Sequence, residues 1–144
     1  INEPNSIEYR TSLAWADTIA GICLSNGGAD IPHPLGEIIG GICQRIPHGE
    51  TLAMVYPKFL NYKKNIAIDK FETIANYLGL EKKSEAFVNK VIELLNITSL
   101  SESLEKAEIN DLEKNEILSH PLLKNLDPKN EQTIFDIMNH SINP

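Results

Sequence analysis

Residues 24–50 read LSNGGADIPHPLGEIIGGICQRIPHGE, and this stretch decides how the rest of the chain is interpreted. It holds two of the four histidines, His33 and His48, and each follows a proline and precedes a residue that suits the start of a helix. A histidine at a helix start has its ring aimed by a rigid backbone. This suits metal ligation, because a ligand imidazole must keep one orientation. The pattern alone leaves two interpretations open: a pair of metal ligands, or two histidines whose ring nitrogens are satisfied within the core.

Apolar residues recur at helical spacing along most of the chain, and no strand-like alternation of apolar and polar residues extends beyond a few positions. Capping residues, prolines and glycines mark the helix starts and ends, and residues 101–106 are expected to form a turn. We therefore predict an all-α bundle of about seven to eight helices, forming a single helical domain over residues 1–144. The expected helices span residues 7–25, 34–43, 49–62, 69–78, 84–95, 110–119 and 128–139.

Two of the expected helices carry strong packing signals. The helix over residues 34–43 is apolar on nearly every side, which places it in the middle of a domain. Its glycines cost up to about 1 kcal/mol each relative to alanine, so their presence indicates that another helix or a ligand comes close. The first helix is expected to end at residues 26–28 and to pack inward. Its inward stripe would be Leu13, Ala16, Ile19, Ala20 and Cys23.

The two cysteines, Cys23 and Cys43, both lie within apolar helical patterns. We expect both to be reduced core residues, because free cysteine is commonly buried and the spacing is not that of a CxxC motif. Trp15 is expected to be buried as well, or else to cover an edge that a missing part of the protein would leave.

Composition and net charge limit the classes of molecule that the chain is expected to bind. A chain of 144 residues suits one domain, and 13 Lys and Arg against 20 Asp and Glu give a net charge of −7. This negative charge disfavours nucleic acid or an anionic membrane as a partner. No apolar run approaches the roughly 20 residues that span a bilayer, and no secretory leader is visible, so we expect a cytoplasmic protein. The start at Ile1, without methionine, suggests a fragment or a processed product.

The central stretch resembles a known family. Asn26 followed seven positions later by His33, an apolar glycine-bearing helix and then Pro47-His48-Gly49 are similar to the second half of the iron-containing (group III) alcohol dehydrogenases. Residues 8–22 and 125–137 resemble two further helices of that family. The resemblance implies the helical fold shared by the C-terminal domains of these enzymes and the dehydroquinate synthase-like proteins.

The resemblance also implies a metal site. In the family, an Asp and a His from an earlier helix and two later histidines hold one divalent metal beside the nicotinamide of NAD(P). His33 and His48 would be the third and fourth ligands, and the first two would lie upstream of Ile1. Leu24 would lie beside the nicotinamide. Glu37 stands where many relatives carry a further histidine, so it is a candidate for a catalytic or metal-binding role, and a solvated or ion-paired carboxylate is the alternative.

The implied activity is hydride transfer between a small alcohol or aldehyde and NAD or NADP, with Fe²⁺ or Zn²⁺ polarising the substrate oxygen. The chain has no GxGxxG, Walker, HExxH or GxSxG motif. In the family, the cofactor phosphates are held by a glycine-rich N-terminal domain. The resemblance therefore implies that the cofactor binds mainly to that domain of a longer, homo-oligomeric enzyme, a dimer, and that the chain alone is inactive. Two alternatives remain: a glycerol dehydrogenase-like or other zinc relative of the same fold, and a non-catalytic helical interaction module.

Overall fold

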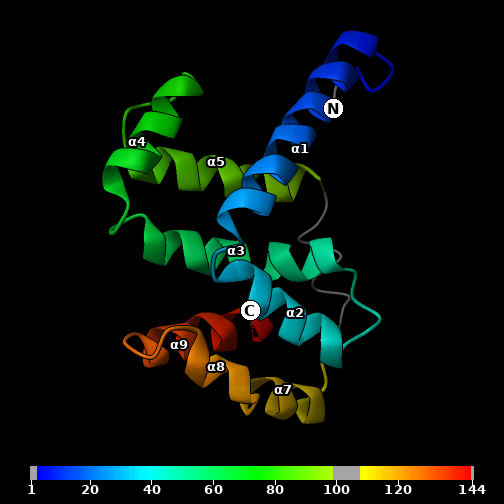
Figure 1. Cartoon of the computed structure of the whole chain (residues 1–144), viewed down its shortest axis with the longest axis vertical. Coiled ribbons are helices and arrows are strands. Elements are labelled where there is room, and N and C mark those ends of the chain that lie inside the picture. The colour runs from blue at the N-terminus through cyan, green and yellow to red at the C-terminus, as the bar shows by residue number, and fades with distance from the viewer. Residues whose placement is uncertain (1–2, 99–107, 144) are drawn as a thin grey trace. The chain divides into compact units, whose positions relative to one another are not determined.

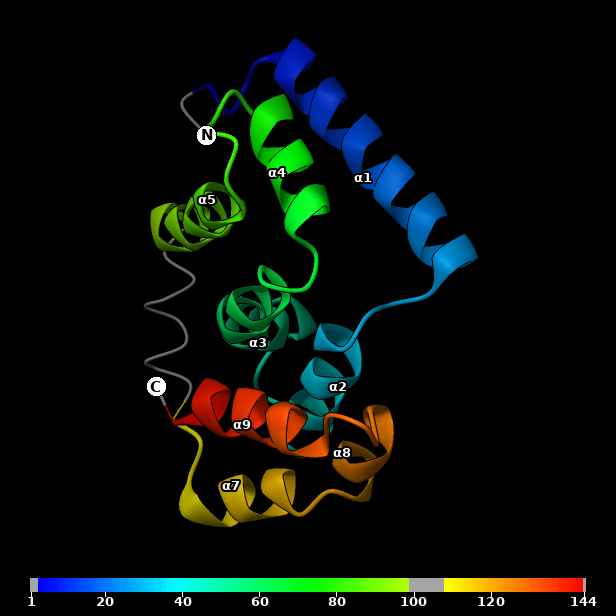
Figure 2. The same ribbon diagram turned by 90° about the vertical axis from the view of Figure 1, so that its left-hand side faces the viewer.

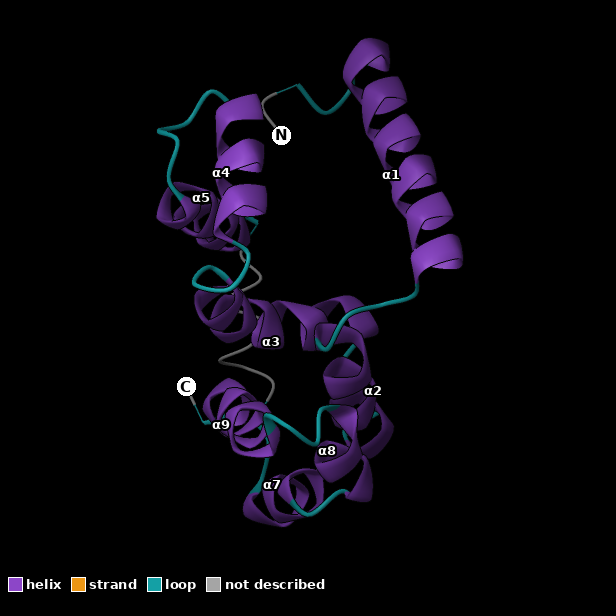
Figure 3. Cartoon of the chain, turned by 60° about the vertical axis from the view of Figure 1, so that its left-hand side comes forward, coloured by secondary structure: helices purple, strands orange, loops and turns teal. Residues whose placement is uncertain are grey.

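The computed structural model describes residues 3–98 and 108–143, and these residues form helices and connecting loops without a strand (Figures 1 and 3). The predicted all-α class is confirmed for this part of the chain, whereas the turn predicted at 101–106 lies outside the described residues. Eight helices are described. They are α1 (Ile7–Gly27), α2 (Pro32–Ile42), α3 (His48–Lys63), α4 (Ile68–Tyr77), α5 (Ser84–Ile97), α7 (Asp111–Leu118), α8 (Pro121–Leu126) and α9 (Glu131–Ile142).

The chain divides into two compact units, Ile1–Asp30 and Ile31–Pro144. The first unit consists mainly of α1. Its start is capped by Ser6, whose hydroxyl oxygen accepts a hydrogen bond from a backbone N–H of the first turn. Its end is closed by Gly28, which has a φ of +73° and donates its N–H to the Leu24 carbonyl at 2.9 Å. Glycine fits this position because a positive φ costs it little.

The predicted inward stripe of α1 is wrong. No residue of α1 is buried, and Cys23 is exposed, in contrast to the expected core position. Trp15 is also exposed, with 63% of its surface accessible. The physical reason is that α1 forms a unit largely by itself, and a single helix has nothing against which to bury its apolar residues. Cys43, in the second unit, is buried as predicted.

The second unit is built around α2 and α3. In Figure 2, α3 lies between the pair formed by α4 and α5 and the C-terminal helix α9. Helix α3 contacts α5 and α9, and α4 contacts α5. Helix α2 packs against α3 and α7. The buried residues of α2 and α3 recur mostly every three to four positions, which places them on one face of each helix. The fully buried large side chains include Leu35, Ile39, Val55, Val88, Ile117, Ile134 and Met138.

Several helix boundaries differ from the prediction, and one helix was not predicted. The largest shift is in α9, which spans Glu131–Ile142 rather than 128–139. Helix α2 starts at Pro32 rather than Pro34, since prolines fit the first turn, where a backbone N–H has no partner within the helix. Helix α3 starts at His48 itself, with Pro47 as its N-cap. The short helix α8 was not predicted. Its N-cap is His120, whose Nδ1 accepts the Leu122 N–H at 3.3 Å, and histidine is not among the residues usually read as helix starts.

No helix in the described part of the chain combines the length and apolar character that crossing a bilayer requires.

Candidate metal centre

Helices α2 and α3 approach closely at Gly36 and Thr51. A Cβ built on Gly36 would lie 2.9 Å from Thr51 Oγ1 and 3.1 Å from Leu52 Cδ2, so only glycine fits without a shift. This explains why a glycine occupies an apolar helix, as the sequence indicated. Gly36 is three residues after His33, and Thr51 is three residues after His48. The close approach is therefore one turn from each histidine and sets the distance between the two helix starts.

The two imidazole rings lie side by side at these helix starts. Their centroids are 5.5 Å apart, and the ring planes are tilted by 50°. His33 is partly buried and His48 is exposed. Neither ring makes a hydrogen bond to another residue in the described part of the chain. One ion about 2.0–2.1 Å from a nitrogen of each ring, at a tetrahedral angle, requires ring centroids about 5 Å apart. The observed separation of 5.5 Å is close to this value.

The backbone at His48 is held by local hydrogen bonds. The Pro47 carbonyl accepts the Glu50 N–H at 2.9 Å and the Thr51 N–H at 3.1 Å, which forms the first turn of α3. The Thr51 hydroxyl is fully buried and donates to the His48 carbonyl at 2.8 Å. Thr51 thus links the contact with Gly36 to the backbone that carries His48.

The connection between α2 and α3 is tied to the start of α7 by an ion pair. Arg45 Nη1 and Nη2 contact the two carboxylate oxygens of Glu113 at 2.5 and 2.7 Å. The Arg45 hydrogen bonds, and a backbone hydrogen bond from Asn110, lower the pKa of Glu113 to about 2. Burial raises the pKa of the nearby Cys43 thiol, and the carboxylate of Glu113 adds to this effect.

Residues 1–142 match the protein family described as "Fe-containing alcohol dehydrogenase family, C-terminal". The chain belongs to the iron-containing alcohol dehydrogenase family. The family predicted from residues 24–50 is therefore confirmed, and the helical fold agrees with its C-terminal part. No solved structure matches the chain significantly.

The chain is also similar to three curated proteins, which are distant in sequence and longer than this chain. The 1,3-propanediol dehydrogenase of Citrobacter freundii is 27% identical over 75 residues, which cover 52% of this chain and 19% of that protein. The NAD-dependent methanol dehydrogenase of Bacillus methanolicus is 29% identical over 73 residues, 51% of this chain and 19% of that protein. The 1,3-propanediol dehydrogenase of Klebsiella pneumoniae is 27% identical over 75 residues, again 52% and 19%. The chain thus matches about a fifth of the length of these relatives.

The other two candidate residues from the sequence, Glu37 and Leu24, are both exposed. Glu37 is exposed, and no group of three or more His, Cys, Asp or Glu residues suited to a metal ion occurs in the described residues. Glu37 therefore completes no cluster with the histidines, and a catalytic role for it stays a prediction. Leu24 lies in α1 and is 45% exposed. His120 caps α8, and the Nδ1 of the exposed His140 lies 2.7 Å from the Asp136 carbonyl oxygen.

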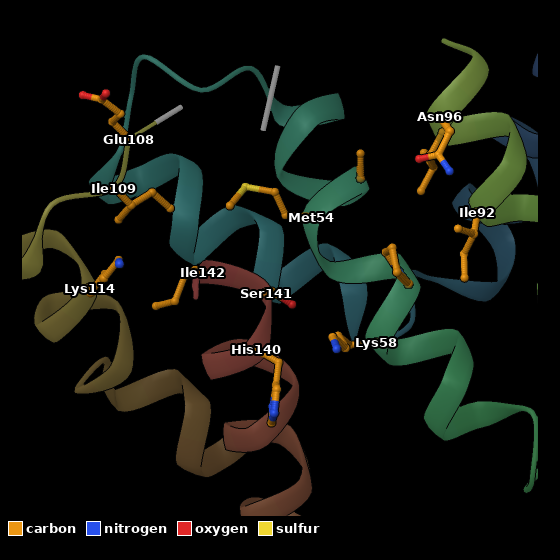
Figure 4. A pocket seen from close by; sticks show the side chains of 13 residues that line it. Met54, Lys58, Ile92, Asn96, Glu108, Ile109, Lys114, His140, Ser141 and Ile142 are labelled. Carbon is orange, nitrogen blue, oxygen red and sulfur yellow. The ribbon is translucent and has the colours of Figure 1, made fainter. Parts of the chain in front are cut away.

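A separate cavity lies among α3, α5, α7 and α9, with a volume of about 510 Å³ (Figure 4). Its lining is mostly apolar and includes Met54, Ile92 and Ile142, with Lys58 and Lys114 among the polar residues. Neither histidine of the candidate metal centre lines it.

Proposed function

We propose that the chain is the metal-binding helical part of an NAD(P)-dependent alcohol dehydrogenase-like oxidoreductase acting on a small alcohol or aldehyde. One observation carries the proposal: two imidazoles without hydrogen-bond partners among the described residues lie 5.5 Å apart, at the starts of two packed helices. Two such rings suit a borderline divalent ion such as Fe²⁺ or Zn²⁺, and imidazole does not select between them. The names of the curated relatives, two propanediol dehydrogenases and a methanol dehydrogenase, support the substrate class.

In this proposal, His33 and His48 would hold the metal together with ligands from a preceding helix, as the family resemblance implies. The bound ion would supply Lewis-acid chemistry at the oxygen of the alcohol or carbonyl substrate. The chain's own contribution is orientation. Pro47 and the Thr51 hydroxyl fix the backbone at His48, and the close contact of Gly36 with Thr51 sets the spacing of the rings.

NAD or NADP would bind mainly to the N-terminal domain that the resemblance implies, with Leu24 as a contact of the nicotinamide. The described helices offer no glycine-rich turn after a strand to receive a dinucleotide. The chain alone is therefore expected to bind metal weakly and to be inactive, and the complete protein is expected to be a homo-oligomer.

The metal proposal is tested by titrating Co²⁺, Zn²⁺ and, without oxygen, Fe²⁺ into this chain. His33→Ala and His48→Ala should each lower the metal affinity at least about tenfold, since even outer partners of metal ligands contribute about 10–100-fold. His140→Ala is the matched control, because this exposed histidine lies on α9 and is not assigned to the site. Equal losses in all three variants would show that the histidines bind metal nonspecifically.

The catalytic proposal requires the full-length protein. Metallated full-length protein should reduce NAD(P) in the presence of an alcohol, and this chain alone should not. Turnover that depends on zinc and prefers glycerol would favour the glycerol dehydrogenase-like alternative. No turnover across a broad panel of alcohols and aldehydes would favour the non-catalytic helical module.

A further inference from the structure

We propose that Arg45 is a positioning residue for the candidate metal centre. Its ion pair with Glu113 holds the connection between α2 and α3 in place, and this keeps the His48 ring beside His33. The inference rests on the proposed function, because what Arg45 positions is a proposed metal ligand. It assigns a role to two charged residues that do not belong to the histidine pair.

The contact between Arg45 and Glu113 has defined geometry. Two guanidinium nitrogens meet two carboxylate oxygens, at 2.5 Å for Nη1 to Oε1 and 2.7 Å for Nη2 to Oε2. Arg45 Nη2 also donates to the Glu108 carbonyl at 2.7 Å. A two-point contact of this kind fixes direction as well as distance, which a single ammonium group cannot do. Arg45 is thereby bound to a segment more than sixty residues away in the chain.

Glu113 is itself rigidly held. It belongs to a capping box, in which its N–H donates to Asn110 Oδ1 at 3.0 Å and its Oε2 accepts the Asn110 N–H at 3.0 Å. Only 17% of its side chain is exposed. The same helix places Ile117 fully in the core, so the acceptor end of the ion pair is anchored to the packed interior.

The backbone between Arg45 and His48 has little conformational freedom. Cys43 and Ile46 on either side of Arg45 are buried, and the Ile46 N–H donates to the Cys43 carbonyl at 2.9 Å. Pro47, the N-cap of α3, has a φ fixed by its ring. Because the two intervening residues are one core side chain and one proline, a displacement of Arg45 moves the start of α3 and the ring that it carries.

The test compares two variants with the same change in charge. Arg45→Gln removes the contact with Glu113, and Lys64→Gln removes the ion pair of Lys64 with Glu85 between α3 and the start of α5. Each makes the chain more negative by one charge, which by itself favours binding of a cation. We expect Arg45→Gln to weaken Co²⁺ binding about tenfold, the lower end of what orienting partners contribute, and Lys64→Gln to leave it unchanged or slightly tighter.

A second readout does not need the metal. The ring carbon-bound proton signals of His33 and His48 in NMR spectra of the metal-free chain should shift in Arg45→Gln, whereas those of His140 should not. Arg45→Lys keeps the charge but not the two-point contact, and should recover only part of the metal affinity. It also serves as the folded variant if Arg45→Gln unfolds.

The outcomes separate this inference from the proposed function. If the unaltered chain shows no binding that depends on His33 and His48, the metal proposal fails, and the positioning role fails with it. If binding depends on the histidines but Arg45→Gln and Lys64→Gln bind Co²⁺ equally well, only the positioning role is wrong. A loss of unfolding free energy in Arg45→Gln without a change in metal affinity or ring signals would also contradict it, because the ion pair would then act on stability alone.

Discussion

At the scale of single residues, Gly36 controls how closely α2 and α3 approach. Gly36→Ala would place a methyl group 2.9 Å from Thr51 Oγ1 and 3.1 Å from Leu52 Cδ2. Since Thr51 is fully buried and its hydroxyl bonds to the His48 carbonyl, it cannot move without losing that bond. We expect a loss of about 1–3 kcal/mol in unfolding free energy, the usual cost of overpacking, together with weaker metal binding. Chemical denaturation and metal titration measure the two effects.

Gly41→Ala is the control for this prediction. Gly41 lies in the same helix, and nothing lies within 4 Å of a Cβ built there, so the change should raise stability by up to about 1 kcal/mol through helix propensity. Gly36→Ala combined with Thr51→Ala should lose less stability than the sum of the two single changes, because the second removes the atom that the first meets. Equal effects of Gly36→Ala and Gly41→Ala would contradict the close approach.

At the scale of helices, apolar spacing predicted the buried residues correctly where one face of a helix packs against neighbouring helices. Phe87, Val88 and Val91 of α5 belong to the core or pack against it, as the spacing indicated. The prediction failed for α1, because its apolar residues are spread around the helix. Their spacing does not indicate which neighbouring element, if any, covers them. Helix α8 was missed because six residues carry too little periodicity and because its N-cap, His120, is not one of the usual capping residues.

The candidate site was predictable only in part. Two Pro-His pairs at helix starts could be read from local sequence, since each depends on adjacent residues. The 5.5 Å separation of the rings could not, because it arises from the packing of Gly36 on Thr51. The contact of Arg45 with Glu113 could not be predicted from the sequence either, because the two residues lie on segments that only the folded chain brings together.

Helix α7 carries a pH dependence through its capping glutamate. The folded state lowers the pKa of Glu113 from 4.5 to about 2, chiefly through Arg45 and then through the Asn110 N–H. The folded chain therefore binds this proton less readily than the unfolded chain does. The stabilisation is complete above about pH 4.5 and is lost as the pH falls towards 2. Chemical denaturation at a series of pH values should show that the unfolding free energy falls less steeply below pH 4.5 in Glu113→Gln than in the unaltered chain. If the unfolding free energies of the two chains changed with pH in parallel, Glu113 would not be the source of this pH dependence.

At the scale of the whole molecule, stability and association are expected to reside in different units. Among the described residues, every buried apolar side chain lies within Ile31–Pro144, whereas α1 exposes large apolar side chains that include Leu13, Trp15 and Ile22. A chain shortened to residues 31–144 should therefore keep a cooperative unfolding transition near the original midpoint, because an exposed helix of this kind adds little stability of its own. It should also keep its Co²⁺ affinity, since both histidines lie within it.

The same division predicts how the chain behaves in solution. Exposed apolar side chains gathered on one helix favour self-association, so the 144-residue chain should form larger species as its concentration rises. The shortened chain should sediment as a monomer over the same range. Analytical ultracentrifugation of both, with circular dichroism to verify folding, measures the difference. If the shortened chain unfolds, α1 contributes to the core of the second unit. If both chains associate equally, the apolar surface responsible lies within residues 31–144.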